Sequence, residues 1–130
     1  MVGDPIPVAF DPRGIVVTPN GKKVYVANAG GTVSVIDTVT NKVTSTINLN
    51  ANNGAYALGC AITPDGKYVY VPNQSARTVV MISTQTDAVV GEPVSVGNTP
   101  GLIAIAPNGK RAYVTNLFDS TVSIIQITGA

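Results

Sequence analysis

Three times the sequence repeats one segment, first as Thr18-Pro19-Asn20-Gly21-Lys22-Lys23-Val24-Tyr25-Val26-Ala27-Asn28. The second copy is Thr63-Pro64-Asp65-Gly66-Lys67-Tyr68-Val69-Tyr70-Val71-Pro72-Asn73. The third copy is Ala106-Pro107-Asn108-Gly109-Lys110-Arg111-Ala112-Tyr113-Val114-Thr115-Asn116. The shared tyrosines lie 45 and then 43 residues apart, which is the length of one four-stranded blade of a β-propeller. The repeat therefore predicts an all-β propeller with three four-stranded blades per chain.

Each repeat divides into four short runs rich in valine, isoleucine, threonine and tyrosine, without the 3.6-residue period of a helix. A Pro-Asn/Asp-Gly-Lys segment follows the first run, and these residue types suit a tight turn. The predicted first strands are Gly14–Val17, Gly59–Ile62 and Gly101–Ile105, and the second strands are Lys23–Ala27, Tyr68–Val71 and Arg111–Thr115. The third strands are Thr32–Asp37, Thr78–Ser83 and Thr121–Ile127, and the fourth are Val43–Leu49 and Glu92–Val96. We expect one domain over residues 1–130, with a fourth strand at 2–8, blades at 14–49 and 58–96, and a partial blade at 101–127.

The predicted strands carry apolar residues on both faces, as in the run Val24-Tyr25-Val26. A sheet with one face in water would instead alternate apolar and polar residues. Both faces should therefore be buried, as they are when blades stack around an axis. A single β-sandwich would also bury apolar strands, but it does not explain the repeat of 43–45 residues.

The segments Tyr25–Asn28, Tyr70–Asn73 and Tyr113–Asn116 resemble the signature of the YVTN family of repeat proteins. The run Thr32-Val33-Ser34-Val35-Ile36-Asp37-Thr38 is similar to the strand that follows this signature in the family. The resemblance covers nearly the whole chain. Members of the family are mostly seven-bladed domains of prokaryotic surface-associated proteins. The resemblance thus implies a propeller and, for a parent protein, a place at the prokaryotic cell surface or in the periplasm.

The N-terminal run Val2-Gly3-Asp4-Pro5-Ile6-Pro7-Val8 matches the internal run Val90-Gly91-Glu92-Pro93-Val94-Ser95-Val96, a predicted fourth strand. The order of strands is therefore a fourth strand followed by the first three strands of a blade, three times over. Propellers have four to eight blades, and six is the multiple of three in that range. Three blades alone would expose two apolar faces and two unpaired edges.

These observations predict a homodimer that closes a six-bladed ring by strand exchange, with residues 2–8 of one chain paired to Thr121–Ile127 of the other. The predicted self-assembly residues are Val2, Ile6, Val8, Val122, Ile124 and Ile127. Two alternatives are a fragment of a seven-bladed surface protein and an engineered half-propeller.

The composition narrows the partners that we expect. Hydrophobic residues make up 45% of the chain and charged residues only 12%, which suggests that more surface is covered than in a monomer. The formal net charge of +1 and the scattered lysines and arginines argue against nucleic acid, which needs clustered positive charge. No apolar run is long enough for a transmembrane helix, and the first residues do not form a signal peptide. We therefore expect no nucleic-acid partner and no membrane insertion.

The sequence contains few residues of the types that form catalytic sites. The sequence has no histidine, which excludes Ser-His-Asp and Cys-His arrangements and imidazole metal sites. The lone Cys60 lies in an apolar run and is interpreted as a small buried residue rather than a reactive thiol. The seven carboxylates lack the spacing of a metal loop, and Ala29-Gly30-Gly31 lacks the strand-to-helix context of a phosphate loop. We expect no cofactor, no metal and no enzyme activity.

Binding is the remaining class of function. In propellers, ligands approach the loops that join fourth to first strands and second to third strands. In this chain the notable side chains of those loops are aromatic or charged, namely Phe10, Asp11, Tyr56, Arg77, Phe118 and Asp119. Arg13, near the start of an inner strand, is a further candidate that could point into the channel and attract anions or could equally face the surface. Exposed aromatics could stack on a sugar or anchor a peptide, but each could equally fold under its own loop.

The sequence therefore favours a non-catalytic scaffold or recognition module that self-assembles and presents loops to a protein or glycan. The alternatives are a propeller hydrolase or lactonase with a channel site, and a propeller fragment with no activity of its own.

Overall fold

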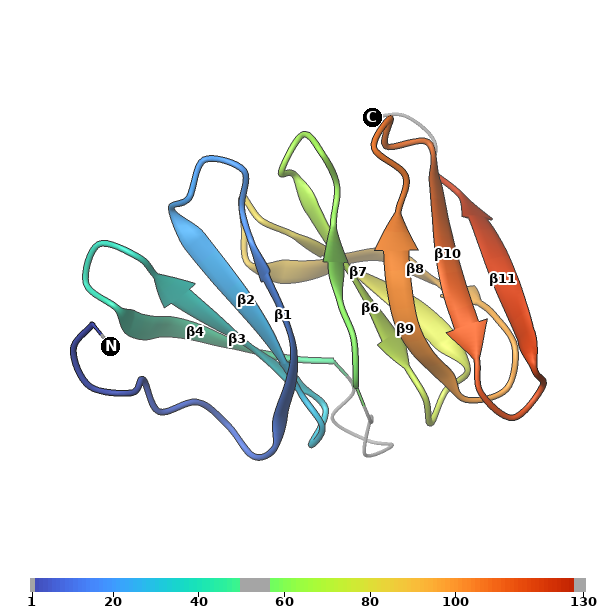
Figure 1. The fold of residues 1–130 in the computed structure, drawn as a ribbon, viewed down its shortest axis with the longest axis horizontal. Coiled ribbons are helices and arrows are strands. Elements are labelled where there is room, and N and C mark those ends of the chain that lie inside the picture. The colour runs from blue at the N-terminus through green and yellow to red at the C-terminus, as the bar shows by residue number, and fades with distance from the viewer. Residues whose placement is uncertain (1, 50–56, 128–130) are drawn as a thin grey trace.

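The fold is that of a computed structural model, which describes residues 2–49 and 57–127. In this part of the chain the secondary structure consists of β-strands joined by turns and loops, grouped in three antiparallel sheets. Figure 1 shows the sheets standing side by side, from the blue N-terminal sheet to the red C-terminal one. The all-β prediction of stacked, propeller-type sheets is confirmed at this level.

The first sheet has the order β1 (Pro12–Val17), β2 (Lys23–Asn28), β3 (Thr32–Asp37) and β4 (Lys42–Asn48). The second sheet has the order β5 (Ala61–Ile62), β6 (Tyr68–Asn73), β7 (Thr78–Ser83) and β8 (Ala88–Ser95). The third sheet has three strands among the described residues, β9 (Pro100–Ile105), β10 (Arg111–Asn116) and β11 (Thr121–Gln126). Each strand pairs with the next one along the chain, so each sheet is a simple meander.

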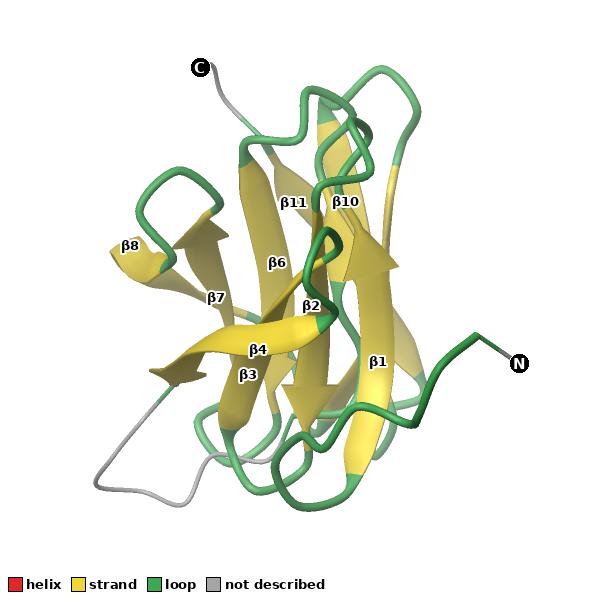
Figure 2. Cartoon of the chain, turned by 90° about the vertical axis from the view of Figure 1, so that its left-hand side faces the viewer, coloured by secondary structure: helices red, strands yellow, loops and turns green. Residues whose placement is uncertain are grey.

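Residues 2–11 form no strand in this isolated chain. Figures 1 and 2 show this segment running along the outer side of the first sheet before it enters β1. The predicted strand at 2–8 was assigned to a contact with a second chain, and in the absence of that chain it remains a prediction.

Two hydrophobic clusters hold the sheets together. The first lies between the first and second sheets and includes Tyr25, Val35, Val69 and Ile82. The second lies between the second and third sheets and includes Tyr70, Val79, Val114 and Ile125. The middle sheet is therefore covered on both faces, as the two-sided apolar pattern predicted.

The exposure of the repeated tyrosine differs between the three sheets and indicates which faces of the sheets are covered. Tyr25 is 0% exposed against the second sheet and Tyr70 is 4% exposed against the third, whereas Tyr113 is 40% exposed. Tyr113 shares the outward face of the third sheet with Leu102, Val122 and Ile124, which are also exposed. The same residue type in the same register is buried between sheets and exposed on the last one.

The joint between the first two sheets also contains a polar contact. The Tyr25 hydroxyl donates to Asp87 Oδ1 at 2.6 Å, and Lys23 Nζ lies 3.1 Å from Asp87 Oδ2. Asp87 belongs to the turn before β8, so the repeated second strand of one sheet contacts the turn between the last two strands of the next. Burial first, and then the hydrogen bond to Asp87, raise the pKa of Tyr25.

Candidate functional site

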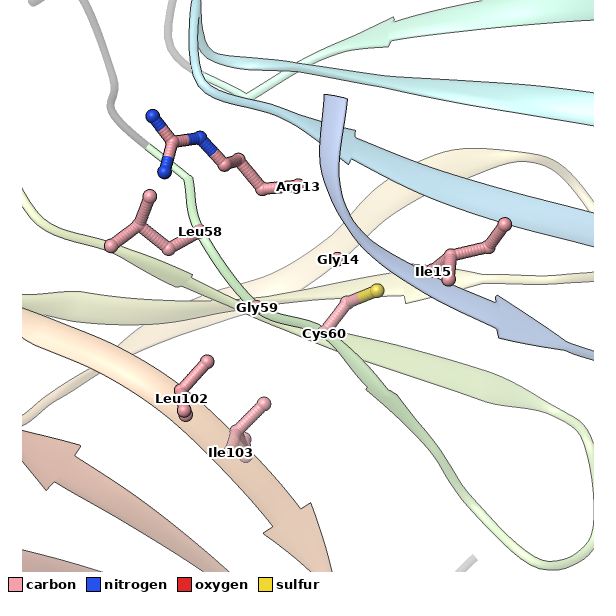
Figure 3. A pocket seen from close by; sticks show the side chains of 8 residues that line it. All are labelled: Arg13, Gly14, Ile15, Leu58, Gly59, Cys60, Leu102 and Ile103. Atoms are coloured by element: carbon pink, nitrogen blue, oxygen red, sulfur yellow. The ribbon is translucent and has the colours of Figure 1, made fainter. Parts of the chain in front are cut away.

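The innermost strands of the three sheets converge on a cavity of about 420 Å³. Three segments line it: residues 13–15 of β1, residues 58–60 just before β5, and residues 102–103 of β9. Figure 3 shows β1 passing over Gly59 and Cys60, with Leu102 and Ile103 on the opposite side. The lining is apolar except for Arg13, Cys60 and backbone groups. This position corresponds to the central axis around which propeller blades are arranged.

Glycine makes this convergence possible. A Cβ atom on Gly14 would lie 2.9 Å from the backbone atoms of Gly59 and Cys60. Such a distance requires the backbone to shift, because neither neighbour is a flexible side chain. The first and second sheets therefore meet at backbone-to-backbone distance at this point, and the shape of the cavity depends on it.

Arg13 brings the charge at the cavity, and it is held by Asp11. The guanidinium donates to both carboxylate oxygens, Nε to Oδ1 at 3.0 Å and Nη2 to Oδ2 at 2.9 Å. This bidentate geometry fixes the orientation of the arginine and places its counter-charge beside it. A backbone hydrogen bond fixes Asp11 in turn, because its carbonyl accepts the amide of Ala29 at 2.9 Å.

Cys60 is the one side chain of the cavity with nucleophilic chemistry. Burial raises the pKa of its thiol to about 12, against a weaker opposing effect of a hydrogen bond to the backbone of Ala27. A thiol with this pKa is protonated at neutral pH and is a poor nucleophile. The interpretation of Cys60 as a structural residue therefore agrees with its surroundings.

The predicted binding loops lie at one end of the molecule, at the bottom of Figure 1. In the first and third sheets a backbone hydrogen bond joins the loop before the first strand to the loop after the second strand, from Ala29 to Asp11 and from Leu117 to Thr99, each at 2.9 Å. The carboxylate of Asp119 also accepts the amide of Asn98 at 2.7 Å. Phe10 and Phe118 project from these loops and are 79% and 78% exposed.

The predicted site residues are only partly brought together. Asp11 and Arg13 form an ion pair, and Arg13 lines the cavity. Arg77, Phe118 and Asp119 are exposed on the loops of the second and third sheets. Tyr56 lies outside the described residues. The binding role of all seven remains a prediction.

Sequence reasoning missed most of the cavity. Cys60, Leu102 and Ile103 lie in predicted first strands and Leu58 lies next to one, and the sequence assigned none of the four a role in binding. A signal was present, because a glycine occurs in or next to the lining at each first strand, at Gly14, Gly59 and Gly101. Such a position in a strand often marks a close approach between backbones.

In residues 2–49 and 57–127, no three acidic or cysteine side chains gather in a group that could hold a metal ion. Over the same residues, no helix is long and apolar enough to cross a membrane.

Comparisons with known proteins show similarity to parts of larger propeller-like structures. Hydrazine synthase from Kuenenia stuttgartiensis matches with 27% identity and a TM-score of 0.80, over 97% of this chain and 36% of that one. A putative 6-phosphogluconolactonase from Bacteroides fragilis matches with 25% identity and a TM-score of 0.80, over 90% of this chain and 35% of that one. The chain thus spans just over a third of the length of either protein. No family model and no curated protein matches the sequence.

Proposed function

We propose that the chain is a non-catalytic recognition module that assembles into a complete propeller and binds a protein or glycan at its loop end. The observation that carries this proposal is the exposure of Phe10 and Phe118, 79% and 78%, on loops that are tied down by backbone hydrogen bonds. A large aromatic side chain on a fixed loop contributes contact area without a large loss of conformational entropy on binding.

Self-assembly is the second part of the proposal. Its support is the set of apolar side chains on the two end sheets, with Ile15 and Val17 exposed on the first and Leu102 and Ile124 on the third. In the second sheet the positions equivalent to Ile15, Val17 and Ile124 are Cys60, Ile62 and Met81, and these three pack against the two hydrophobic clusters. Exposed apolar patches of this kind mark surfaces that other protein surfaces cover.

Arrays of glycans and of peptides test the recognition role. Labelled wild-type protein and a double variant with Phe10→Ala and Phe118→Ala are applied to the arrays. We expect some of the ligands on the arrays to bind the wild type and not to bind the variant. A third variant, Val39→Ala, is the matched control because Val39 is also a large exposed residue, at 85%. Equal binding by all three proteins, or no binding on either array, would contradict the proposal.

A second candidate is a propeller hydrolase that opens a lactone. It is favoured by the likeness to the putative 6-phosphogluconolactonase and by the Arg13–Asp11 pair at the edge of the cavity. In this role Arg13 would attract an anionic group of the substrate, and Asp11 would accept a proton from the attacking water. The two groups neutralise each other in the isolated chain, which is why we rank this function second.

An assay of 6-phosphogluconolactone hydrolysis separates the two candidates. A hydrolase would accelerate the reaction above the uncatalysed rate and lose this acceleration in Asp11→Asn. The recognition module gives the uncatalysed rate for both proteins.

A further inference from the structure

The third sheet has an edge strand whose outer side is unpaired among the described residues. β11 bonds to β10 on one side only. Beside it lies a pocket of about 840 Å³, lined by Met81, Val90 and Val94 of the second sheet and by residues 125–127. The unpaired edge of β11 leaves backbone donors and acceptors to which an extended strand can be added.

The second sheet shows how a fourth strand fits such an edge. β8 pairs with β7 so that Val94 lies opposite Val79 and Val90 lies opposite Met81. The register shifts between these pairs, so β8 has a bulge that includes Gly91. Tyr68 pairs with Ser83 in the second sheet, and the equivalent Arg111 pairs with Gln126 in the third, so Ser83 and Gln126 are equivalent positions. Counting back along both strands, Val122 and Ile124 of β11 correspond to Val79 and Met81 of β7.

The N-terminal segment has the sequence and part of the backbone shape of β8. Residues 2–8 match residues 90–96 in the order of valine, glycine, acidic residue and proline. Gly3 has a φ of 66°, and Gly91 at the bulge has a φ of 68°, a conformation that favours glycine. The two segments also lead into equivalent loops, because Asp11 and Thr99 have φ values of 55° and 58°.

A buried side-chain oxygen in the first sheet also supports a β8-like course for the N-terminal segment. Asn116 Oδ1 accepts the amide of Gly97, the residue that follows the matching run, at 3.1 Å. The equivalent atom, Asn28 Oδ1, is buried and has no hydrogen-bond partner among the described residues. A buried carbonyl oxygen without a partner is destabilising. Ala9 corresponds to Gly97, and its amide would satisfy Asn28 if residues 2–9 followed the course of β8 instead of running along the first sheet.

We propose that residues 2–8 of one copy form the fourth strand of the third sheet of a second copy, reciprocally, with Ile6 opposite Val122 and Val2 opposite Ile124. This inference rests on the self-assembly in the proposed function and adds the segment, the edge and the register. It places the exposed face of the third sheet, with Tyr113, against the exposed face of the partner's first sheet. The two copies then make a closed ring of six blades.

The same equivalence between the sheets predicts a polar contact between the third sheet of one copy and the first sheet of the other. Asn41 occupies the turn position of Asp87, since both have positive φ, 55° and 53°, and both amides bond to the carbonyl four residues earlier. Arg111 and Tyr113 occupy the positions of Lys23 and Tyr25, which both contact Asp87. Arg111 and Tyr113 of one copy therefore face Asn41 of the other.

Disulfide cross-linking tests the register directly. In the full chain, Ile6→Cys and Val122→Cys are combined, because opposite residues of antiparallel strands have Cβ atoms close enough for a disulfide. After mild oxidation we expect a covalent dimer on a non-reducing gel, with both engineered thiols consumed. The control combines Ile6→Cys with Ser123→Cys, whose side chain points to the other face of β11, and it should remain uncross-linked. Wild-type protein controls for Cys60.

Each result has one meaning when sedimentation is measured on the same samples. A dimer in solution that cross-links in the first variant only supports the inference. A dimer that fails to cross-link overturns the strand register but leaves the proposed self-assembly standing. A monomer in sedimentation overturns both. A disulfide within one chain, or a ladder of larger covalent species, overturns the reciprocal exchange between two copies.

Discussion

At Gly14 the backbone of β1 lies so close to residues 59 and 60 that a methyl group has no room. A Cβ atom would lie 2.9 Å from three backbone atoms, and backbone can move aside only by separating the first two sheets. We therefore expect Gly14→Ala to lower the free energy of unfolding by about 1–3 kcal/mol, measured by urea denaturation at one protein concentration.

Gly30→Ala is the matched control for this change. A Cβ atom on Gly30 meets nothing within 4 Å, so its effect should stay within about 0.5 kcal/mol. Equal changes in the free energy of unfolding for Gly14→Ala and Gly30→Ala would contradict the close approach of β1 to the backbone of residues 59 and 60.

Asp87 connects two sheets through a single carboxylate. It accepts the Tyr25 hydroxyl at 2.6 Å and lies 3.1 Å from Lys23 Nζ, and its side chain is 20% exposed. Asp87→Ala leaves the Tyr25 hydroxyl with only a longer contact to the carbonyl of Thr84, at 3.4 Å. We expect a loss of about 1–2 kcal/mol in urea unfolding, and a smaller loss for Asp87→Asn, whose amide oxygen still accepts a hydrogen bond. A larger loss for the asparagine variant than for alanine would be inconsistent with this role.

At the scale of single elements, the turn before each second strand is built around one Asn or Asp side chain. In the second sheet Asp65 Oδ1 accepts the Thr63 hydroxyl at 2.6 Å and the Lys67 amide at 3.0 Å. These hydrogen bonds, that of Thr63 first, hold the pKa of Asp65 below its ordinary value. In the first sheet Asn20 makes the same contacts with Thr18 and Lys22.

This turn predicts a pH dependence. Because the folded pKa is lowered, the stabilisation is present above the ordinary pKa of an aspartate and is lost as the pH falls through the folded value. Asp65→Asn should fold with near wild-type stability at pH 7, as Asn20 does in its turn, and should lose less stability than wild type on acidification. Thermal unfolding from pH 7 to pH 2 measures this, and identical acid profiles for the two proteins would argue against the carboxylate's role.

The strands were largely predictable because their signal is local. The repeated Pro-Asn/Asp-Gly-Lys turns and β-branched runs placed the third strands Thr32–Asp37 and Thr78–Ser83 at the bounds of β3 and β7. The predicted fourth strand Glu92–Val96 began four residues too late, since β8 starts at Ala88 and continues through a bulge at Gly91 that breaks the alternation. The predicted strand Gly59–Ile62 is shorter in the structure, where β5 covers only Ala61 and Ile62.

The candidate site was less predictable because it depends on distances between sheets. Nothing local to Leu58 or Leu102 indicates that both line one cavity with Arg13. The ion pair of Arg13 and Asp11 lies within three residues of sequence, yet its relevance follows from the cavity beside it. The sequence placed Phe10 and Phe118 in loops but left open whether each side chain is exposed or folds under its loop, and the structure shows both exposed.

For the molecule as a whole, both end sheets expose apolar side chains. One end exposes Ile15 and Val17, the other exposes Leu102, Tyr113 and Ile124, and the second sheet shows how such faces pack when covered on both sides. We interpret the arc as half of a ring, with the loop-end aromatics then present twice around one axis. Two copies of a weak binding loop in a fixed arrangement would raise the apparent affinity for a repetitive ligand.

A charge introduced at Asn41 should tighten this assembly. In the proposed dimer Asn41 faces Arg111 of the other copy, so Asn41→Asp would recreate the contact that Lys23 makes with Asp87. Each joint should gain up to about 1 kcal/mol, and the two joints of the ring should together lower the dimer Kd by up to about thirtyfold at low salt. Sedimentation velocity over a dilution series measures the Kd. Thr40→Asp, on the same turn and exposed, is the control for added negative charge. An equal effect of both variants would show that the turn position of Asn41 is not at the joint.

The central claim, that a second copy completes the arc through residues 2–8, is tested most directly by the mass of the full chain in sedimentation equilibrium. The account predicts twice the 13.3 kDa of one chain at concentrations of about 10–100 µM, and the mass of a single shortened chain after deletion of residues 2–8. A mass of 13.3 kDa for the undeleted chain throughout this range, or an unchanged dimer after the deletion, would contradict it.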